Sequence, residues 1–186
     1  MRTKLKTVPF RRKMEGKTNY YKRLRLLRTR MARIIVRPAL SNITAQIATY
    51  EDKGDKIVVG ATGKALERFG WKAHKGNVPA AYLVGYLLGR LALKKNVREA
   101  VLDTGLRSPV KGGRIYACVK GLKDAGVHVP VDESILPSEE RIKGGHIAAY
   151  AQQNKERFTG YARQGVNPVA IAQLFDNVKK KIEGST

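Results

Sequence analysis

The spacing of hydrophobic residues along the chain predicts a mixed α/β protein. Short apolar stretches at residues 33–37, 43–48 and 56–59 alternate with polar residues or stop at turn residues, which is typical of half-buried strands. An Asp-Lys-Gly-Asp turn at 52–55 separates the second stretch from the third. We therefore expect these three strands to form an antiparallel meander. A fourth short apolar run, at 100–102, predicts a strand that is buried on both faces.

A long helix is predicted to follow the meander. Asn77 is a suitable N-cap, Pro79 fits the first turn, and apolar residues then recur at helical spacing until near residue 96. Gly85 and Gly89, four residues apart on this helix, indicate a close approach of its backbone to the sheet. We therefore expect the helix to pack on the sheet.

The next part of the chain predicts a second helix and a final strand. The helix spans residues 113–126, with Cys118 among its inward-facing residues, and a short apolar run at 127–129 follows it. The order strand, helix, strand, helix, strand produces parallel, right-handed crossovers. The predicted fold is α/β, with a mixed sheet in which an antiparallel three-strand meander is followed by βαβ-type crossovers.

Both ends of the chain lie outside this pattern. Residues 1–18 contain few apolar residues and include the helix breakers Pro9 and Gly16, which predicts an irregular arm. A helix is expected to begin after Asn19. Its apolar stripe comprises Tyr20, Leu24, Leu27 and Met31. Beyond residue 130, short helical pieces lead to a terminal helix. Its stripe comprises Ile171, Leu174, Phe175, Val178 and Ile182.

Positive charge is concentrated in the first part of the chain. Residues 1–37 contain fourteen of the 37 Lys and Arg residues and a single acid, Glu15. Solvated surfaces interleave both signs, whereas a segment of one sign repels itself until a polyanion binds. Nucleic acid is the commonest such partner, because neutralising its phosphates releases counterions. An anionic membrane surface is the main alternative at this point.

Composition excludes several classes of site. The single cysteine, Cys118, excludes an internal disulfide, and its place on an apolar helix face indicates an inert core thiol. His74, His128 and His146 lie far apart without Cys or carboxylate at ligand spacing, so no metal or other cofactor is expected. The most apolar stretch, residues 80–93, is shorter than the roughly 20 residues of a membrane span. We expect a soluble, cytoplasmic protein without a membrane partner or a small-molecule substrate.

Two motifs and one set of aspartates suggest catalysis, but each lacks a feature that the chemistry requires. Asp103-Thr-Gly has the form of an aspartic-protease motif, yet no second such carboxylate is available to share a proton with it. Residues 60–64 resemble a phosphate loop without its first glycine and its metal-binding hydroxyl. Asp103, Asp124 and Asp132 fall on separate predicted elements, so a two-metal nuclease site is not indicated. An enzymatic role is therefore not expected.

Three basic regions with aromatic neighbours can form one RNA-binding surface. They are the arm with its helix, the stretch 71–76, and the loop 106–114, which leads into a helix N-terminus where free amides favour anions. Arginine–phosphate contacts and stacked tyrosine rings are ordinary in RNA recognition. Trp71 suits the core as well as a stacking platform. The residues predicted to bind RNA are Arg11, Arg12, Lys13, Lys17, Tyr20, Tyr21, Lys22, Arg23, Arg25, Arg28, Arg107, Lys111 and Arg114.

Several motifs also resemble those of a known family. They lie at residues 8–13, 16–20, 23–27, 70–71, 76–85, 100–106 and 144–147. In this order they are similar to family eighteen of the large-subunit ribosomal proteins, whose archaeal and eukaryotic members bind 5S rRNA. One departure is the Ser-Asn-Ile-Thr turn at 41–44, where relatives often carry basic residues. No phosphate contact is expected from that turn.

The resemblance implies a non-enzymatic, structural constituent of the large ribosomal subunit in the cytoplasm. It implies that the protein binds 5S rRNA through the arm, the sheet surface and the loop 106–114, and helps to anchor it in the central protuberance. Large-subunit rRNA and neighbouring ribosomal proteins of the central protuberance are the further partners implied. A basic RNA-processing enzyme is the alternative, and a membrane-surface or chromatin-type binder is a third interpretation.

These features divide the chain into three predicted parts. Residues 1–30 form a basic N-terminal RNA-binding arm and helix, residues 31–130 an α/β globular domain, and residues 131–186 a mainly helical C-terminal extension.

Overall fold

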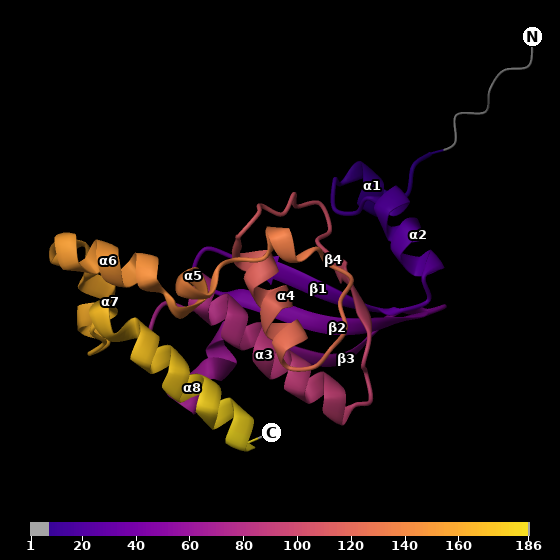
Figure 1. Ribbon diagram of the computed structural model, residues 1–186. Helices are drawn as coiled ribbons and strands as arrows, with labels where there is room; N and C mark the ends of the chain where they lie inside the picture. Colours follow the sequence, from indigo (N-terminus) through magenta and orange to yellow (C-terminus); the bar gives the residue numbers. More distant parts are fainter. Residues whose placement is uncertain (1–7, 186) are drawn as a thin grey trace, which may run out of the picture.

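A four-stranded mixed sheet forms the centre of the protein (Figure 1). The structure is a computed structural model and describes residues 8–185, apart from the side chain of Lys155. In sheet order, the strands are β3 (Gly54–Thr62), β2 (Ile43–Glu51), β1 (Ala32–Pro38) and β4 (Ala100–Asp103). The first three are antiparallel neighbours, whereas β4 pairs in parallel with β1. The predicted meander and the mixed α/β fold are confirmed.

Two helices cover one face of this sheet. α3 (Val78–Lys94) lies against β2 and β3, and α4 (Arg114–Asp124) lies against β1 (Figure 1). Alternate residues of β1, such as Ile34 and Val36, are completely buried on this side because side chains of a strand point to opposite faces in turn. The start of α3 is capped as predicted: the backbone N–H of Ala80 donates to Oδ1 of Asn77 at 2.8 Å.

Glycines let α3 and α4 contact each other closely. A Cβ atom added at Gly85 would overlap the backbone carbonyl of Cys118, and one added at Gly121 would overlap that of Tyr82. At Gly89, too, the nearest atoms would belong to the end of α4. The prediction that Gly85 and Gly89 approach the sheet is therefore wrong. Both lie on the side of α3 that faces α4, and helical spacing alone does not say which neighbour a small-residue face meets.

β4 is an edge strand and not a strand covered on both faces. Ala100 is its one fully buried residue. The segment after α4 adds no fifth strand, because residues 127–129 form only a single parallel bridge, between Glu99 and His128. The two valines of this segment are buried in the core without a ladder of their own. The predictions of a doubly covered strand and of a final strand are wrong because the apolar runs reflect packing and not strand pairing.

The C-terminal part folds back onto α3. Its helices are α5 (Glu139–Lys143), α6 (Gly145–Gln153), α7 (Thr159–Arg163) and α8 (Ile171–Ser185). Short 3-10 helices complete the chain: η1 (Gly63–Phe69), η2 (Glu133–Ile135), η3 (Lys155–Phe158) and η4 (Pro168–Ala170). Phe175, Val178 and Ile182 of α8 are buried, and the hydroxyl of Tyr86 on α3 donates to Glu183 at 2.9 Å. The predicted stripe of the terminal helix is confirmed.

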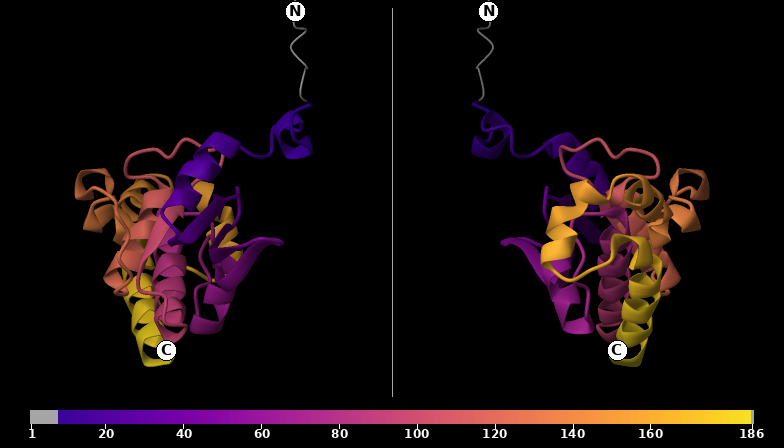
Figure 2. Two further views of the ribbon diagram at one scale, coloured as in Figure 1. Left: turned by 90° about the vertical axis from the view of Figure 1, so that its right-hand side faces the viewer. Right: turned by 90° about the vertical axis from the view of Figure 1, so that its left-hand side faces the viewer.

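Two short helices form the N-terminal arm. α1 (Arg11–Met14) is a single turn, and α2 (Tyr20–Arg28) follows it; both views of Figure 2 show α1 beyond the body of the protein. Asn19 caps α2 as predicted, accepting a hydrogen bond from the N–H of Lys22 at 3.1 Å. The irregular stretch predicted over 1–18 is wrong at α1, where an ion pair four residues apart, Arg11 with Glu15, supports a turn. Residues 1–7 of that prediction lie outside the described residues.

Other predicted properties concern the core and the absence of special sites. Cys118 is fully buried, and burial raises the pKa of its thiol to about 12, as an inert core thiol requires. Within residues 8–185, no helix is both long and apolar enough to cross a membrane. The same described residues contain no group of three or more His, Cys, Asp or Glu that could hold a metal. The three-part division of the chain stays a prediction.

Candidate nucleic-acid interface

The side of α2 that contacts the body differs from the predicted apolar stripe at two of its four positions. Arg23 Nη2 lies 2.8 Å from Asp55 Oδ1 of β3, and Leu26 is half-buried beside β4. Leu24 is 54% exposed, and Met31 lies beyond the end of the helix. The predicted apolar stripe is therefore wrong at these two positions. An ion pair to a distant strand fixes the rotation of α2, and such a partner leaves no periodic signal in the helix itself.

A buried arginine connects the docking point of α2 to the sheet. Arg33 of β1 is only 1% exposed, with Nη2 2.5 Å from Asp55 Oδ1 and Nη1 3.3 Å from Asp103 Oδ2. A buried charge is tolerated only when it is paired. Burial alone would raise the pKa of Asp55, but the hydrogen bonds and charges of Arg33 and Arg23 outweigh it and hold that pKa below its ordinary value. Asp55 thus joins α2, β1 and β3 as an ionised carboxylate.

Asp103 organises the turn that follows β4. Its Oδ1 accepts the backbone N–H of Gly105 at 2.8 Å, and its backbone carbonyl accepts Nη1 of Arg37 at 2.9 Å. The Arg37 Nη2 atom also lies 3.7 Å from Asp103 Oδ1. The Asp-Thr-Gly motif is therefore a turn that positions a strand arginine.

A small hollow of about 100 Å³ lies between the arm, the end of β1 and the turn after β4. We call it the arm hollow. Its lining comprises Arg12, Lys17, Thr18, Asn19, Lys22, Arg23, Arg37, Asp103, Gly105 and Leu106. Asp103 is the one acid in this lining, and its carboxylate already contacts Arg33 and Arg37. The site therefore keeps an excess of positive charge and has the size and donors to hold a phosphate group.

The structure brings four of the predicted RNA-binding residues together at the arm hollow: Arg12, Lys17, Lys22 and Arg23. Two features order the arm around them. Arg12 Nε donates to Thr18 Oγ1 at 2.9 Å, and Glu15 Oε2 pairs with Lys17 at 2.8 Å. Hydrogen bonds from Arg11 and Lys17 lower the pKa of Glu15, which remains ionised and offsets part of the charge of α1.

Aromatic rings lie in three different settings. Tyr20 packs against Phe10, with ring centroids 5.0 Å apart, and so holds α1 to α2. Tyr21 is 75% exposed, with Lys13 Nζ 5.8 Å from its ring centroid, and is free to stack on a base. Trp71 is completely buried, and its indole N–H donates to the backbone carbonyl of His74 at 3.4 Å. The sequence left two interpretations of Trp71 open, and the structure places it in the core.

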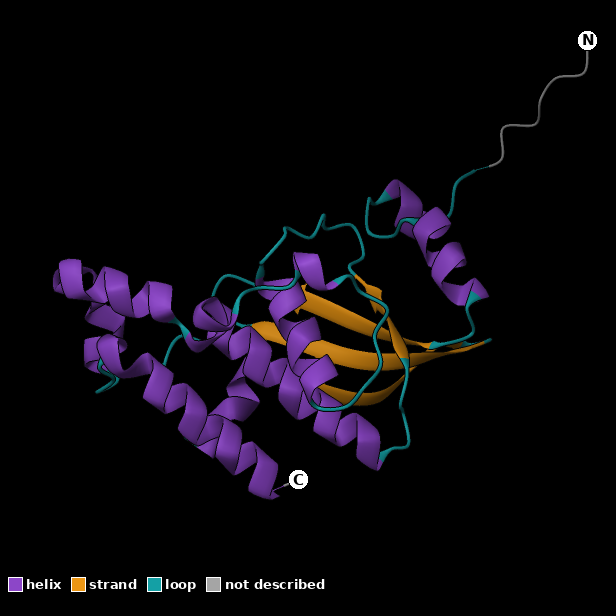
Figure 3. Ribbon diagram, in the orientation of Figure 1, coloured by secondary structure: helices purple, strands orange, loops and turns teal. Residues whose placement is uncertain are grey.

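Of the remaining predicted residues, Arg11 and Lys13 are exposed on α1. The others lie on α2, on the loop before α4, drawn in teal in Figure 3, and at the start of α4. Arg25 and Arg28 are exposed on α2, and Arg107 and Lys111 are exposed on the loop. Arg114 is different, because its Nη1 donates to the backbone carbonyls of residues 39 and 76 at 2.7 and 3.0 Å. It connects the β1–β2 turn to the start of α3, so Nη1 of its guanidinium group is already engaged in hydrogen bonds that stabilise the fold.

Two arginines of the site were not predicted. Arg33 and Arg37 lie four residues apart on β1, and residues separated by an even number share one face of a strand. Two arginines on one face of an otherwise apolar strand are a signal that could have indicated a charged or RNA-facing surface. Arg33 is the buried anchor of that surface, and Arg37 lines the arm hollow.

Comparisons with known proteins match both the arm and the body. Residues 4–99 match the family model described as "Ribosomal large subunit proteins 60S L5, and 50S L18". The chain is also 44% identical over 184 residues to the large ribosomal subunit protein uL18 of Thermofilum pendens. That alignment covers 95% of this chain and 94% of the relative. The matches therefore include the arm hollow, the sheet and the C-terminal helices.

Proposed function

Since the chain belongs to the family of large-subunit ribosomal proteins that includes 60S L5 and 50S L18, we propose that it binds 5S rRNA and helps to anchor it in the central protuberance. Its role is structural and not enzymatic. Large-subunit rRNA and neighbouring ribosomal proteins are its further partners in the cytoplasmic ribosome.

The arm hollow is the observation that carries this proposal. Lysine and arginine side chains from α1, the following loop, α2 and β1 converge there around a space of about 100 Å³. Charge-assisted hydrogen bonds from arginine to phosphate are short and strong, and each neutralised phosphate releases counterions. Arg23 and Asp55 hold α2 on the sheet, which fixes Lys22 and Arg23 beside Arg37 at this space.

The face of the sheet opposite α3 and α4 extends this surface. Arg33 is opposite Ala48 in the β1–β2 register, and Ala48 is opposite Ile57 in the β2–β3 register, so these residues share a face. Tyr50, which is opposite Asp55, lies on the same face and is 54% exposed. An exposed tyrosine beside the docking point of α2 suits stacking on an unpaired base.

The test is the salt dependence of 5S rRNA binding by the full chain. Replacing Arg12, Lys17 and Lys22 together by Gln removes three cations of the arm hollow. Since each phosphate contact contributes about 0.7–0.9 to the slope of log K against log salt, the slope is expected to fall by roughly two to three.

The matched control removes the same charge elsewhere. Lys94, Lys95 and Lys180 are exposed in the C-terminal parts of α3 and α8 or directly after α3. The C-terminal ends of these two helices lie away from the arm in Figure 1. The triple Gln variant at these positions is expected to keep the slope of the wild type. Equal slopes for the arm variant and the wild type would contradict the placement of the site.

A further inference from the structure

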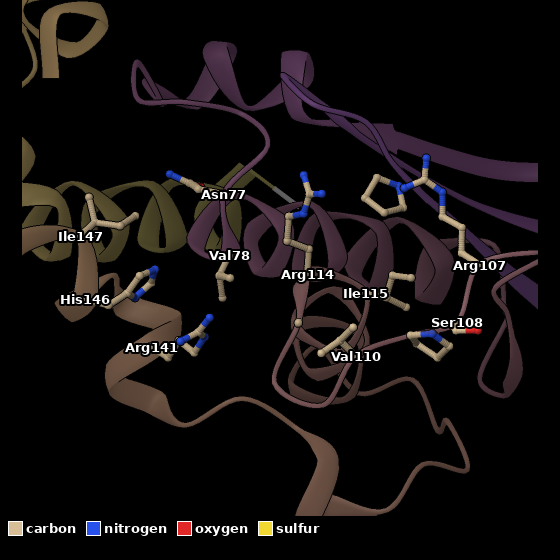
Figure 4. A pocket seen from close by; sticks show the side chains of 13 residues that line it. Asn77, Val78, Arg107, Ser108, Val110, Arg114, Ile115, Arg141, His146 and Ile147 are labelled. Carbon is tan, nitrogen blue, oxygen red and sulfur yellow. The ribbon is translucent and has the colours of Figure 1, made fainter. Parts of the chain in front are cut away.

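A second, larger hollow lies beside the loop that precedes α4. Its volume is about 550 Å³, within the roughly 300–1,000 Å³ typical of ligand sites. It lies between that loop, the starts of α3 and α4, and the turn from α5 to α6, as Figure 4 shows. We call it the loop hollow. Its position makes it the place where the C-terminal extension meets the basic loop.

The ionisable groups around the loop hollow are three arginines and a histidine. Arg107 comes from the loop, Arg114 from α4, Arg141 from α5 and His146 from α6, and its lining includes no Asp or Glu. Arg107 and Arg141 are exposed, and neither forms an ion pair with any carboxylate of the described residues. Arg114 is held in place by two backbone carbonyls. Two unpaired guanidinium groups at one hollow favour an anionic ligand.

The walls of the loop hollow are apolar. They are formed by Pro38, Val78, Pro109, Val110, Ile115 and Ile147. An inorganic anion would gain nothing from such walls, because apolar surface favours an apolar or aromatic group. A nucleotide combines a flat aromatic base with a phosphate. Unpaired RNA bases stack on arginine planes and apolar side chains, which are the groups that this hollow offers.

The loop hollow adjoins the arm hollow along the chain. Arg37 lines the arm hollow, and the next residue, Pro38, lines the loop hollow. In the same way, Leu106 lines the arm hollow and Arg107 lines the loop hollow. Two pairs of consecutive residues therefore form the boundary between the sites. An RNA strand with a phosphate in the arm hollow is within reach of the loop hollow, which favours RNA over an acidic peptide as the occupant.

We propose that the loop hollow holds an unpaired nucleotide of the RNA bound by the arm. Its base contacts the apolar walls, and the phosphates on either side of it contact Arg107 and Arg141, which lie at opposite ends of the hollow in Figure 4. This inference rests on the proposed function, and it adds the C-terminal extension, through Arg141 and His146, to the RNA-binding surface.

The first test compares charge-matched variants of the full chain binding 5S rRNA. Arg107→Gln with Arg141→Gln is expected to weaken binding by at least about tenfold and to lower the salt slope by roughly 1.4–1.8. Arg157→Gln with Arg163→Gln removes two exposed arginines of the same extension that do not line the hollow, and is expected to leave the slope unchanged. Equal slopes for both double variants would overturn the inference while leaving the arm site intact.

A second variant tests whether the space inside the hollow is needed, without a change in charge. Val110 is 73% exposed on its lining, so Val110→Trp adds bulk at the hollow without removing a cation or a core contact. Ultraviolet crosslinking followed by mass spectrometry, on the 5S rRNA complex and on intact large subunits, is expected to attach a nucleotide to residues 106–115 or 141–147. The Val110→Trp variant is expected to lose that crosslink and keep those of the arm.

Crosslinking both the isolated 5S rRNA complex and intact large subunits distinguishes failure of this inference from failure of the proposed function. If the chain fails to bind isolated 5S rRNA, the proposed function fails, and crosslinks in intact subunits still decide the occupant of the hollow. A nucleotide of another rRNA there supports the inference. Crosslinks of residues 106–115 and 141–147 to a neighbouring protein alone, or nucleotides found only on the arm, overturn it.

Discussion

Replacing Asp55 by Asn distinguishes two contributions to RNA binding, the positioning of α2 and the net charge of the protein. The change removes an acid and raises the net charge of a strongly basic protein. On charge alone, RNA binding should therefore become tighter. Asp55, however, holds both Arg23 of α2 and Arg33 of β1. Without its charge, α2 loses its ion pair with the sheet, and the cations of the arm hollow lose their fixed positions. We expect RNA binding to become weaker.

The size of the effect follows from the burial of Arg33. Breaking a buried ion pair costs about 3–5 kcal/mol when the remaining charge is left alone. Here Asp103 still contacts Arg33 at 3.3 Å, and the Asp55 side chain is 23% exposed, so water compensates in part. We expect the free energy of unfolding to fall by roughly 1–3 kcal/mol. Ordering α2 again on binding is expected to weaken 5S rRNA affinity by about three- to tenfold.

The pH dependence provides a check on the same carboxylate. The pKa of Asp55 is lower in the folded protein than its ordinary value of 3.8, so its stabilisation is present above that value and is lost as the pH falls through the folded pKa. The stability difference between wild type and Asp55→Asn should thus be largest near neutral pH and shrink below about pH 4. Thermal unfolding monitored by circular dichroism at several pH values measures it.

Asp52→Asn is the matched control. Asp52 lies in the β2–β3 turn, is exposed and forms no ion pair with the described residues, so the substitution changes charge by the same amount without touching α2. It is expected to leave stability nearly unchanged and RNA affinity equal or slightly higher. If Asp55→Asn also bound RNA more tightly than wild type, positioning of α2 by Asp55 would be refuted.

Two further predictions concern the core. Gly85→Ala places a methyl group against the backbone carbonyl of Cys118 and should lower the free energy of unfolding by about 1–3 kcal/mol or more. The control Gly184→Ala, in open space on α8, should be neutral or slightly stabilising. Equal denaturation midpoints for the two variants would contradict the close contact of α3 and α4. The buried thiol of Cys118, with its pKa raised to about 12, should not react with Ellman's reagent at pH 8 until the protein is unfolded, and rapid reaction of the native protein would show that α4 is not packed as described.

Local signals in the sequence were sufficient for most elements of the fold. The Asn77 cap and the proline after it identified the start of α3, and the turn at 52–55 identified the hairpin of β2 and β3. The cationic character of the arm was likewise evident, because fourteen bases and one acid lie within residues 1–37. These features depend on neighbouring residues and therefore leave a readable pattern.

Features that depend on distant residues could not be predicted. The rotation of α2 depends on the contact of Arg23 with Asp55, 32 residues away, which its leucine pattern does not indicate. The apolar run at 127–129 looks like a strand, yet it packs in the core with one bridge only. Arg107 and Arg141 line one hollow although no periodicity connects them. In each case a tertiary contact determines the position of the residues, and the local sequence does not indicate which distant residue forms that contact.

The most direct measurement is lysine footprinting of the chain alone and bound to 5S rRNA, read by mass spectrometry after acetylation. Lys17 and Lys22 line the arm hollow and should become protected in the complex, while the exposed Lys94 and Lys180 should react equally in both states. Equal modification of Lys17 and Lys22 with and without bound RNA would contradict the assignment of the arm hollow as the RNA-binding site.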